Sequence, residues 1–531
     1  MLKGRKISKI FGTFRLSSTA AAPAIESSQN ESISLKRKPL ICCKRTPFHL
    51  YVPAPEYSKF GTIPLATNGW KHFKAKGDFM IFNATVSKMD IRAEMLDVQD
   101  FISRSNTSLN DKLLDNVKNE FRISSFTNIQ VKAIPKVLDG HHVLIAAETG
   151  CGKTLAYLLP IAQSIIERKQ RWSSSQTNKK ERKLNTPLAV ILTPGRELAA
   201  QIGGVAEKLC QGTDVRIKTI LGGNTKRLMV NPDFDDVDIV VASFGAISKL
   251  VTTGIYRVGE VRHIVLDEAD TLLDDSFTEK LTHFLRRFPF HRNHTQDDEK
   301  VGTQLILASA TMPTNTEEIL QKVIDVQTLH EVTSPNLHKL MPHVEQRFLR
   351  ISKENRPLNL LKLVQKDIAK NQSLIVFSNK SATSDFVDIF LNNNGVRSVN
   401  LNGDMLTKIR IGRFEKFQNG EYDVLSTTDV ASRGLDTTNI RHVINYDFPL
   451  HVSDYIHRCG RIGRVGNLKT AVVTNFISSR REVEVVQRIE HAARTGGILP
   501  NVNANIKNLI NKKILNDMQA AGMALPEEEA F

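Results

Sequence analysis

The stretch that decides the fold is residues 142–154, which read His-Val-Leu-Ile-Ala-Ala-Glu-Thr-Gly-Cys-Gly-Lys-Thr. Its apolar first half is typical of a buried strand, and the amphipathic residues that follow are typical of a helix. Gly150 and Gly152 allow backbone N–H groups to curl around phosphate oxygens. Lys153 can supply a cation to those phosphates, and the Thr154 hydroxyl can ligate Mg²⁺. The stretch therefore predicts a nucleotide-binding loop, in which Cys151 is interpreted as a packing residue and not as a nucleophile.

Apolar runs of similar length recur along the rest of the chain. Before residue 330 they are His142–Ala147, Ala189–Thr193, Val215–Leu221, Asp238–Ala242, His263–Leu266 and Gln304–Ala308. After an interruption across His330–Glu345 they resume as Arg347–Ile351, Ser373–Phe377, Ser398–Leu401, Asp423–Ser426, His442–Asn445 and Thr470–Asn475. Such runs, separated by helix-length segments, are typical of buried parallel strands in βαβ units. The sequence therefore predicts an α/β fold with two tandem parallel-sheet domains joined by a short linker.

A second informative stretch, residues 263–270, reads His-Ile-Val-Leu-Asp-Glu-Ala-Asp. Here an apolar strand delivers Asp267 and Glu268 at its carboxyl end, where ligands bind in open α/β sheets. Asp267 can hold Mg²⁺ through its water shell, and Glu268 is placed to polarise an attacking water. An acidic turn is the alternative, but two carboxylates directly after a buried strand, in a chain with a phosphate loop, favour catalysis.

Length and composition exclude several classes of protein. A chain of 531 residues is too long for one ordinary core, and 41% hydrophobic residues exclude wholesale disorder. No apolar run approaches the ~18 to 20 residues of a membrane span, so membrane insertion is not expected. Five cysteines cannot form a disulfide framework in a chain of this length. The net charge of +16 suggests a polyanionic partner without placing it.

The N-terminal region does not follow the strand–helix pattern. Residues 1–25 are basic, Ser-rich and acid-poor, as in a mitochondrial presequence, although a solvated basic tail that binds nucleic acid is the alternative. Residues 26–95 are predicted to be an irregular extension outside the cores. This extension contains a second basic run, Lys36–Lys38 and Lys44-Arg45, to which the sequence assigns no task.

Two polar insertions and the C-terminal tail also stand apart. Residues 168–184 and 291–300 are predicted to lie on the surface. The tail, residues 496–531, contains a plausible basic helix at 506–518, which either packs on the second domain or contacts RNA or a partner. Residues 1–52 hold ten Lys and Arg against two acids, and the first insertion holds seven against one, so the predicted cores are close to neutral. Net charge is therefore a poor measure of any RNA-binding surface.

Taken together, Asp267-Glu-Ala-Asp270 and the loop at 147–154 resemble the DEAD-box RNA helicases of superfamily 2. The resemblance runs in order from about residue 100 to 480. The further matching motifs are Ile129-Gln130, Pro194–Ala199, Gly222-Gly223, Ser309–Thr311, Val376–Ser378, Thr428–Asp436 and His457–Arg464.

The resemblance implies two RecA-like domains that use ATP and Mg²⁺. The ATP-binding domain would span 96–332, the linker 333–345 and the helicase C-terminal domain 346–495. The implied ATP contacts are Gln130, Ala147, Glu148, Thr149, Gly150, Cys151, Gly152, Lys153, Thr154 and Asp436, with Thr154 and Asp267 at the metal. Gln130 would read adenine through its amide, and Asp436 would bind the ribose hydroxyls.

The resemblance also implies a division of labour between the domains. Arg461 and Arg464 would be arginine fingers, so with Lys153, Asp267 and Glu268 they form the expected catalytic set. Because the fingers lie on the second domain, hydrolysis would require the two domains to approach. The implied coupling residues are Asp270, Ser309, Thr311 and His457, and the implied RNA contacts are Arg196, Gly223, Thr428 and Arg433.

Three parts of the sequence depart from the family pattern. Phe126-Thr127-Asn128 stands where the family has Pro-Thr-Pro, and Phe101 is our choice for the aromatic that stacks on adenine. Ala246 replaces an arginine of the RNA path, so we expect a weaker or rearranged grip there. Asn402 replaces a common histidine.

The sequence thus predicts a monomeric ATP- and Mg²⁺-dependent RNA helicase that opens short duplexes locally or remodels RNA–protein complexes. By resemblance it is most like fungal mitochondrial DEAD-box proteins that act in ribosome assembly. We expect it in the mitochondrial matrix, on ribosomal RNA and large-subunit assembly intermediates. The alternatives are a nucleotide-gated RNA clamp with little unwinding and a mitochondrial DNA helicase.

Overall fold

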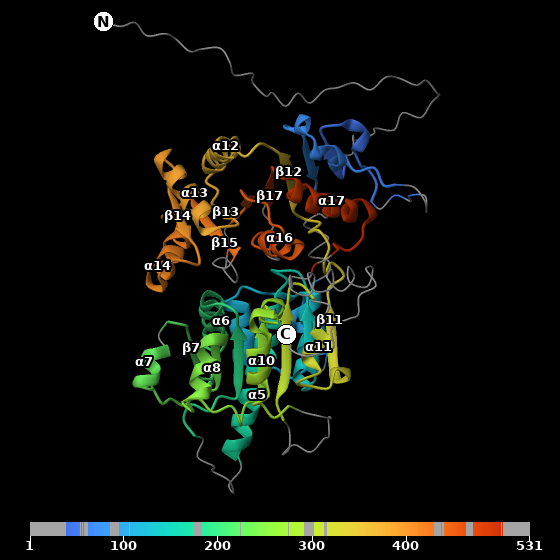
Figure 1. Cartoon of the computed structure of the whole chain (residues 1–531). Coiled ribbons are helices and arrows are strands. Elements are labelled where there is room, and N and C mark those ends of the chain that lie inside the picture. Colours follow the sequence, from blue (N-terminus) through green and yellow to red (C-terminus); the bar gives the residue numbers. More distant parts are fainter. Residues whose placement is uncertain are drawn as a thin grey trace, which may run out of the picture. The chain divides into compact units, whose positions relative to one another are not determined.

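The computed structural model describes residues 39–502 except 54, 56, 58–61, 85–94, 106, 175–182, 224, 274, 291–301, 313–315, 430–436, 438–439, 464–470 and 501. The presequence, the insertion at 291–300 and the helix at 506–518 therefore lie outside the described residues. Among those described, no helix is both long and apolar enough to cross a membrane. Two large sheets organise the fold (Figure 1).

The first domain is built on a seven-stranded parallel sheet of order β11-β5-β10-β9-β6-β8-β7. Its strands are β5 (His142–Ala146), β6 (Ala189–Thr193), β7 (Ile217–Ile220), β8 (Ile239–Ser243), β9 (His263–Asp267), β10 (Gln304–Ser309) and β11 (Leu329–Thr333). Alternate residues of β5 enter two separate apolar clusters, Val143 and Ile145 in one and Leu144 in the other. The sheet is therefore buried on both faces, which explains its continuous apolar runs.

Helices supply the other half of each cluster. Those of the first domain are α2 (Val98–Ser105), α3 (Asp111–Asn119), α4 (Asn128–Leu138), α5 (Lys153–Ser174), α6 (Arg196–Leu209), α7 (Thr225–Val230), α8 (Phe244–Thr252), α9 (Ala269–Leu272), α10 (Asp275–Leu285) and α11 (Thr316–Leu320). Two short strands, β3 (Leu96–Asp97) and β4 (Ser125–Phe126), pair antiparallel beside α2. Part of the first predicted insertion, residues 168–174, continues α5.

The second domain has an eight-stranded sheet of order β1-β2-β12-β17-β16-β13-β15-β14. Its strands are β1 (Ile41–Cys43), β2 (Phe79–Phe82), β12 (Glu345–Arg350), β13 (Leu374–Ser378), β14 (Ser398–Leu401), β15 (Val424–Thr428), β16 (His442–Asn445) and β17 (Val472–Ile477). The helices are α12 (Arg356–Ile368), α13 (Ser381–Asn393), α14 (Thr407–Gln418), α16 (Val452–Cys459) and α17 (Arg480–Thr495). The strands from β12 to β14 pair in parallel, so both domains have the predicted α/β character.

The N-terminal extension is largely irregular, but our prediction that it lies outside the cores is wrong for residues 39–83. β2 pairs antiparallel with β12, and β1 pairs with β2, so the extension adds two strands to the edge of the second sheet. Between them lie the 3₁₀ helices η1 (Thr46–Phe48), η2 (Ala66–Lys71) and η3 (Phe73–Ala75). Trp70 is buried in the core of the second domain, which explains why this segment docks there.

A buried ion pair also holds the extension to α17. The Glu490 carboxylate accepts hydrogen bonds from the Ala66 and Thr67 N–H groups, at 2.8 and 3.0 Å, and from the Thr67 hydroxyl. Arg494 donates to the same carboxylate at 2.8 Å from the next turn of the helix. Both side chains are almost completely buried, so the contact is shielded from water.

Replacing Glu490 should destabilise the second domain strongly. Glu490→Ala leaves the Arg494 guanidinium and two backbone N–H groups buried without this acceptor, at a cost of ~3–5 kcal/mol. Urea unfolding followed by hydrogen exchange at Ala66 and Thr67 measures the loss. Glu484→Gln on the exposed side of α17 is the matched control, because a surface pair contributes only ~0–1 kcal/mol. Equal midpoints for the two variants would contradict the anchoring role.

Candidate nucleotide-binding site

The predicted phosphate loop joins β5 to α5. Gly150 and Gly152 have positive φ angles of 83° and 90°, a backbone region that residues with a Cβ rarely adopt. A Cβ on Gly152 would also lie 2.4 Å from the Gln130 amide nitrogen. Lys153 begins α5, and its ammonium donates to the Ala147 and Glu148 carbonyls at 2.6 and 2.9 Å. The loop thus has the backbone shape that phosphate binding requires.

The loop combines polar atoms without partners, a lysine ammonium and the N-terminus of a helix. The Thr149 hydroxyl and one Glu148 carboxylate oxygen are buried with no hydrogen-bond partner among the described residues. Such groups are costly unless a ligand or water satisfies them. The N-terminus of α5 and the Lys153 ammonium lie in the same loop, so phosphate oxygens suit it.

Cys151 packs inside the loop, in agreement with its interpretation as a packing residue. Burial raises the pKa of its thiol to about 11, against an ordinary value of 9.0. Two pKa units lower the thiolate population about 100-fold at neutral pH. We therefore expect a thiol reagent at pH 7.5 to modify the partly exposed Cys42 first and Cys151 only after unfolding, as read by mass spectrometry of timed samples. Fast labelling of native Cys151 would contradict this account.

The two predicted carboxylates lie where β9 ends. Tyr157 on α5 donates a hydrogen bond to Asp267 at 2.7 Å. Burial raises the pKa of Asp267 to about 6, and the Tyr157 bond opposes that rise. Glu268 adopts a left-handed conformation with φ 52°, and its N–H donates to Asp267 at 2.8 Å. Strain of this kind is concentrated at functional sites.

Glu268 also carries a buried, unsatisfied oxygen. Its Oε2 has no hydrogen-bond partner in the part of the chain that the structure describes, while Oε1 lies 3.8 Å from Arg461 Nη2. Both residues line a cavity of about 260 Å³. Its lining combines Thr149, Gly150, Gly152, Lys153, Thr154, Leu198, Gln201, Asp267, Glu268, Ala308, Ser309, Ala310, His457 and Arg461. One cavity therefore contains the loop, both carboxylates and an arginine from the second domain.

The predicted coupling residues form one buried cluster. Asp270 accepts from the Thr311 hydroxyl at 2.6 Å and from its N–H at 3.1 Å, and His457 Nε2 lies 3.2 Å from the same carboxylate. Burial alone would raise the pKa of Asp270, but His457 and Thr311 hold it well below its ordinary value. Ser309 donates to the Thr311 carbonyl and accepts from the Ala147 N–H at its own carbonyl. The cluster thus joins the phosphate loop to His457.

Arg458 and Arg461 of the 457–464 motif are buried and are not part of a solvated basic face. Arg458 is buried and donates twice to Asp429, at 2.6 and 2.7 Å, and once to Asn379. Arg461 is 3% exposed, and its Nε donates to the His457 carbonyl at 3.1 Å. Arg464, Arg433 and Asp436 lie outside the described residues.

Gln130 lies beside the phosphate loop, at the start of α4. It is buried in the capping box that starts α4, where its Oε1 accepts from the Thr127 N–H at 2.9 Å. Its Nε2 donates to the Gly152 carbonyl at 3.2 Å, so both amide atoms have protein partners. Phe101 is buried edge-on against Phe126, with ring centroids 5.3 Å apart. Our choice of Phe101 as the stacking aromatic is therefore wrong, because neither ring face is accessible.

The RNA-contact candidates follow the carboxyl ends of strands, where parallel sheets collect ligand-binding residues. Arg196 starts α6 after β6, and Gly223 follows β7 with φ 103°. Thr428 is the last residue of β15 and is mostly buried.

The two remaining departures have structural roles. Ala246 is buried in α8, so a side chain at this position faces the core of the first domain. Asn402 donates to Asp385 at 3.0 Å and accepts from the Asp404 N–H at 3.1 Å, which fixes the turn after β14.

Two functional features escaped the sequence reasoning. Tyr157 lies four residues after Lys153, one turn along the same helix, so its approach to the phosphate loop could have been anticipated. The ion pair between Glu197 and Arg410, at 2.7 Å, joins the first domain to α14 of the second. It had no sequence signal, because the partners are 213 positions apart.

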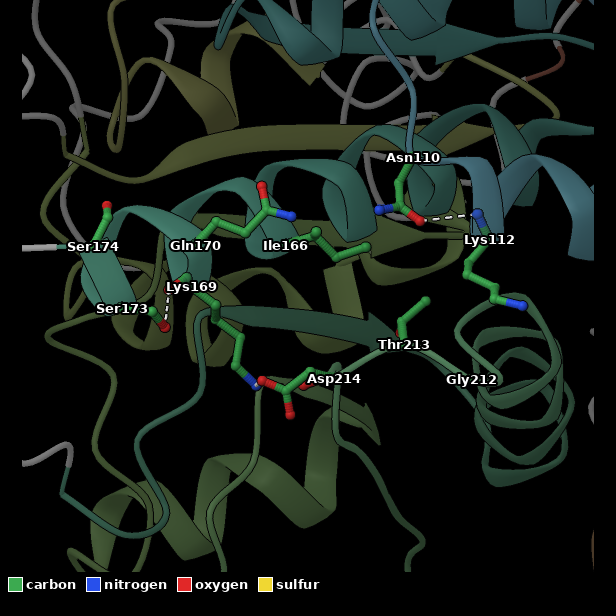
Figure 2. A pocket seen from close by; sticks show the side chains of 10 residues that line it. All are labelled: Asn110, Lys112, Ile166, Lys169, Gln170, Ser173, Ser174, Gly212, Thr213 and Asp214. Carbon is green, nitrogen blue, oxygen red and sulfur yellow. Dashed lines mark hydrogen bonds and ion pairs between the residues drawn. The ribbon is translucent and has the colours of Figure 1, made fainter.

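A larger cavity, of about 540 Å³, lies elsewhere on the first domain (Figure 2). It is formed by the C-terminal part of α5, the start of α3 and residues 212–214 before β7. Lys169 points into it but is neutralised by Asp214 and Asp238, at 3.0 and 3.1 Å. The smaller cavity is therefore the candidate nucleotide site, because it contains the phosphate loop and the unsatisfied polar groups.

A phosphate loop and two carboxylates on one α/β domain, with an arginine supplied by a second, define the class of two-domain nucleotide-dependent motor proteins. Residues 127–319 match the DEAD/DEAH box helicase family and residues 355–466 the helicase conserved C-terminal domain. The chain belongs to the DEAD-box ATP-dependent RNA helicases, and it is accordingly an RNA-dependent ATPase.

Individual relatives agree with this membership. The chain is 33% identical to the probable ATP-dependent RNA helicase DDX28 of Mus musculus over 90% of its own length and 88% of that protein. It is also 33% identical to the Homo sapiens protein of the same name, over 88% of this chain and 87% of that protein. Among solved structures, Mss116p bound to single-stranded RNA and AMP-PNP has a TM-score of 0.62 at 20% identity, covering 81% of this chain and 87% of that one. S. cerevisiae Dbp5 bound to RNA and ADP BeF₃ has a TM-score of 0.59 at 22% sequence identity, and the match covers 78% of this chain and 98% of that one. These structural similarities support two RecA-like domains.

Proposed function

We propose that this helicase uses ATP and Mg²⁺ to open short RNA duplexes locally, or to remodel RNA–protein complexes, in mitochondria. The proposed ATP hydrolysis rests on one observation, which is that Lys153, Glu268 and Arg461 line the same cavity. Phosphoryl transfer depends mainly on positioning and charge stabilisation, and these groups surround the place where the γ-phosphate would lie.

Each side chain has a distinct task in this proposal. Lys153 and the loop N–H groups bind the phosphates, and Glu268 orients the attacking water and accepts its proton. Arg461, with Arg464, stabilises the charge that develops on the transferred phosphoryl group. Asp270, Ser309, Thr311 and His457 transmit RNA binding to this cavity, because their hydrogen bonds connect the two domains.

The residues at the site fit a magnesium ion. Thr154 and Asp267 would hold it, and a bound ion would neutralise phosphate charge. Mg²⁺ commonly takes one or two protein ligands and completes its shell with phosphates and water, and the Thr154 hydroxyl and the Asp267 carboxylate would be such a pair.

RNA would lie along Arg196, Gly223, Thr428 and Arg433, held by its sugar–phosphate backbone. Such contacts position RNA without reading its sequence, so binding should depend on salt and little on sequence. A strand-displacement assay with a short RNA duplex tests the proposal. ATP-dependent displacement supports unwinding, whereas ATP-dependent retention of RNA without displacement would indicate a clamp, and a preference for DNA would overturn the RNA assignment.

The compartment and the biological target rest on the N-terminal sequence and the family resemblance. We propose a presequence at 1–25, domains at 96–332 and 346–495, and action of a monomer in the matrix on ribosomal RNA during large-subunit assembly. Crosslinking in isolated mitochondria, followed by sequencing of the bound RNA, tests this. Enrichment of ribosomal RNA is expected, and its absence would contradict the target.

A further inference from the structure

The docked N-terminal extension carries several exposed basic side chains and one highly exposed aromatic ring. Among its described residues it carries five basic side chains against one acid, Asp78. We define the basic–aromatic face as Lys44, Arg45, Lys71, Phe73, Lys74 and Lys76, all of which are exposed. These residues precede the matched family regions, which begin at 127 and 355.

Contacts within the extension bring the face together from two parts of the chain. The Arg45 guanidinium lies beside Gly69, 3.3 Å from where a Cβ would stand on that residue. The Lys44 ammonium lies beside Gly77, 3.9 Å from where a Cβ would stand there. Both cations also approach the Asp78 carboxylate, at 3.4 and 3.3 Å. The segment 69–77 is therefore bracketed by Lys44 and Arg45.

Hydrogen bonds and burial hold the scaffold beneath this face. Arg350 of β12 donates to the Trp70 carbonyl at 3.0 Å, and its own carbonyl accepts from the Gly77 N–H at 2.7 Å. Trp70 and Ala75 are each 1% exposed, and Glu490 fixes Ala66 and Thr67. Side chains on an ordered scaffold lose less entropy when a ligand binds than side chains on a loose tail.

Charge at the face is only partly neutralised. Asp78 is a single carboxylate shared by two cations, and Lys71 has a partner at 3.9 Å, Glu484. Across the described residues, no carboxylate lies within ion-pair distance of Lys74 or Lys76, although Glu354 interacts electrostatically with Lys76. Phe73, between Lys71 and Lys74, is 74% exposed, more than any other exposed aromatic ring in the described structure.

We propose that the basic–aromatic face is a second binding site for single-stranded RNA, separate from the path across the two domains. Lysines contact successive phosphates while a base stacks on Phe73, which is the combination that holds single strands without reading sequence. An acidic protein surface would satisfy the lysines but would leave the exposed ring unexplained. Because the face lies on the second domain alone, it should bind RNA whether or not nucleotide is present.

The test measures the affinity of the full chain for a fluorescent 20-nucleotide polyuridine RNA without nucleotide, over a range of salt concentrations. Lys74→Gln/Lys76→Gln should weaken binding and reduce the slope of log affinity against log salt by about 1.4, or about 0.7 for each lost phosphate contact. Phe73→Ala should weaken binding at least about fivefold, and Phe73→Tyr should restore it, whereas Phe73→Leu should not.

Lys362→Gln/Lys366→Gln on α12 is the matched control, because it removes the same charge from exposed positions of the same domain. All of these variants should keep the wild-type kcat for ATP hydrolysis at saturating RNA, and only the face variants should need more RNA to reach it. Slopes equal to wild type, or an equal loss in the control, would overturn the second site. If the chain were not an RNA-dependent ATPase at all, RNA would fail to stimulate the wild-type protein. That result differs from the loss of the second site, which would leave wild-type stimulation intact.

Discussion

Glu268→Gln should abolish nearly all ATP hydrolysis while leaving ATP binding intact. The amide keeps the size of the side chain but cannot accept the proton of the attacking water, and loss of a general base costs ~10²- to 10⁴-fold. Glu268 lines the cavity, and its buried Oε2 has no partner among the described residues, so the substitution acts beside the place where the water would lie. Single-turnover hydrolysis with saturating RNA measures the effect.

Glu197→Gln provides a comparison for Glu268→Gln. Glu197 is also a partly buried carboxylate paired with an arginine of the second domain, but it does not line the cavity. We expect it to change the RNA concentration needed for activity more than the rate at saturation. Near-normal hydrolysis by Glu268→Gln would show that another group activates the water.

Arg461→Ala should lower kcat by ~10³- to 10⁵-fold, the range that arginine fingers contribute in related phosphoryl transfers. Arg461 is held at the cavity by its bond to the His457 carbonyl and lies 3.8 Å from Glu268. ATP affinity should change little, because the phosphate loop lies on the first domain. Measuring the steady-state kcat and the ATP affinity separately distinguishes an effect on the reaction step from an effect on ATP binding.

Arg461→Lys and Arg480→Ala complete this experiment. Lysine keeps the charge but loses the planar fork, so only partial recovery is expected. Arg480 begins α17 in an exposed position outside the cavity lining, so its removal should leave kcat unchanged. A parallel loss of ATP affinity and kcat in Arg461→Ala would contradict a role confined to the reaction step.

Strands that are buried on both faces were the most predictable part of the fold. β5, β9 and β13 begin or end within one residue of the predicted apolar runs, because continuous burial requires continuous apolar sequence. β11 was missed because it is an edge strand with only one buried residue, Val332. β1 was missed because a three-residue antiparallel strand has too little periodicity to detect.

The chemistry of the site was more predictable than its contacts. The loop at 147–154 and the carboxylates at 267–268 follow from local sequence, since each occupies the carboxyl end of a buried strand. The Tyr157 bond to Asp267 and the engagement of Gln130 by Thr127 and Gly152 depend on side-chain packing. Such packing is decided by tertiary structure, which a local pattern does not contain.

The steady-state ATPase rate of the full chain with and without single-stranded RNA, measured alongside Glu268→Gln, tests RNA-dependent hydrolysis most directly. The rate should be low without RNA and strongly stimulated by RNA, and the variant should hydrolyse almost no ATP under either condition. An RNA-independent rate, together with normal hydrolysis by Glu268→Gln, would contradict both expectations.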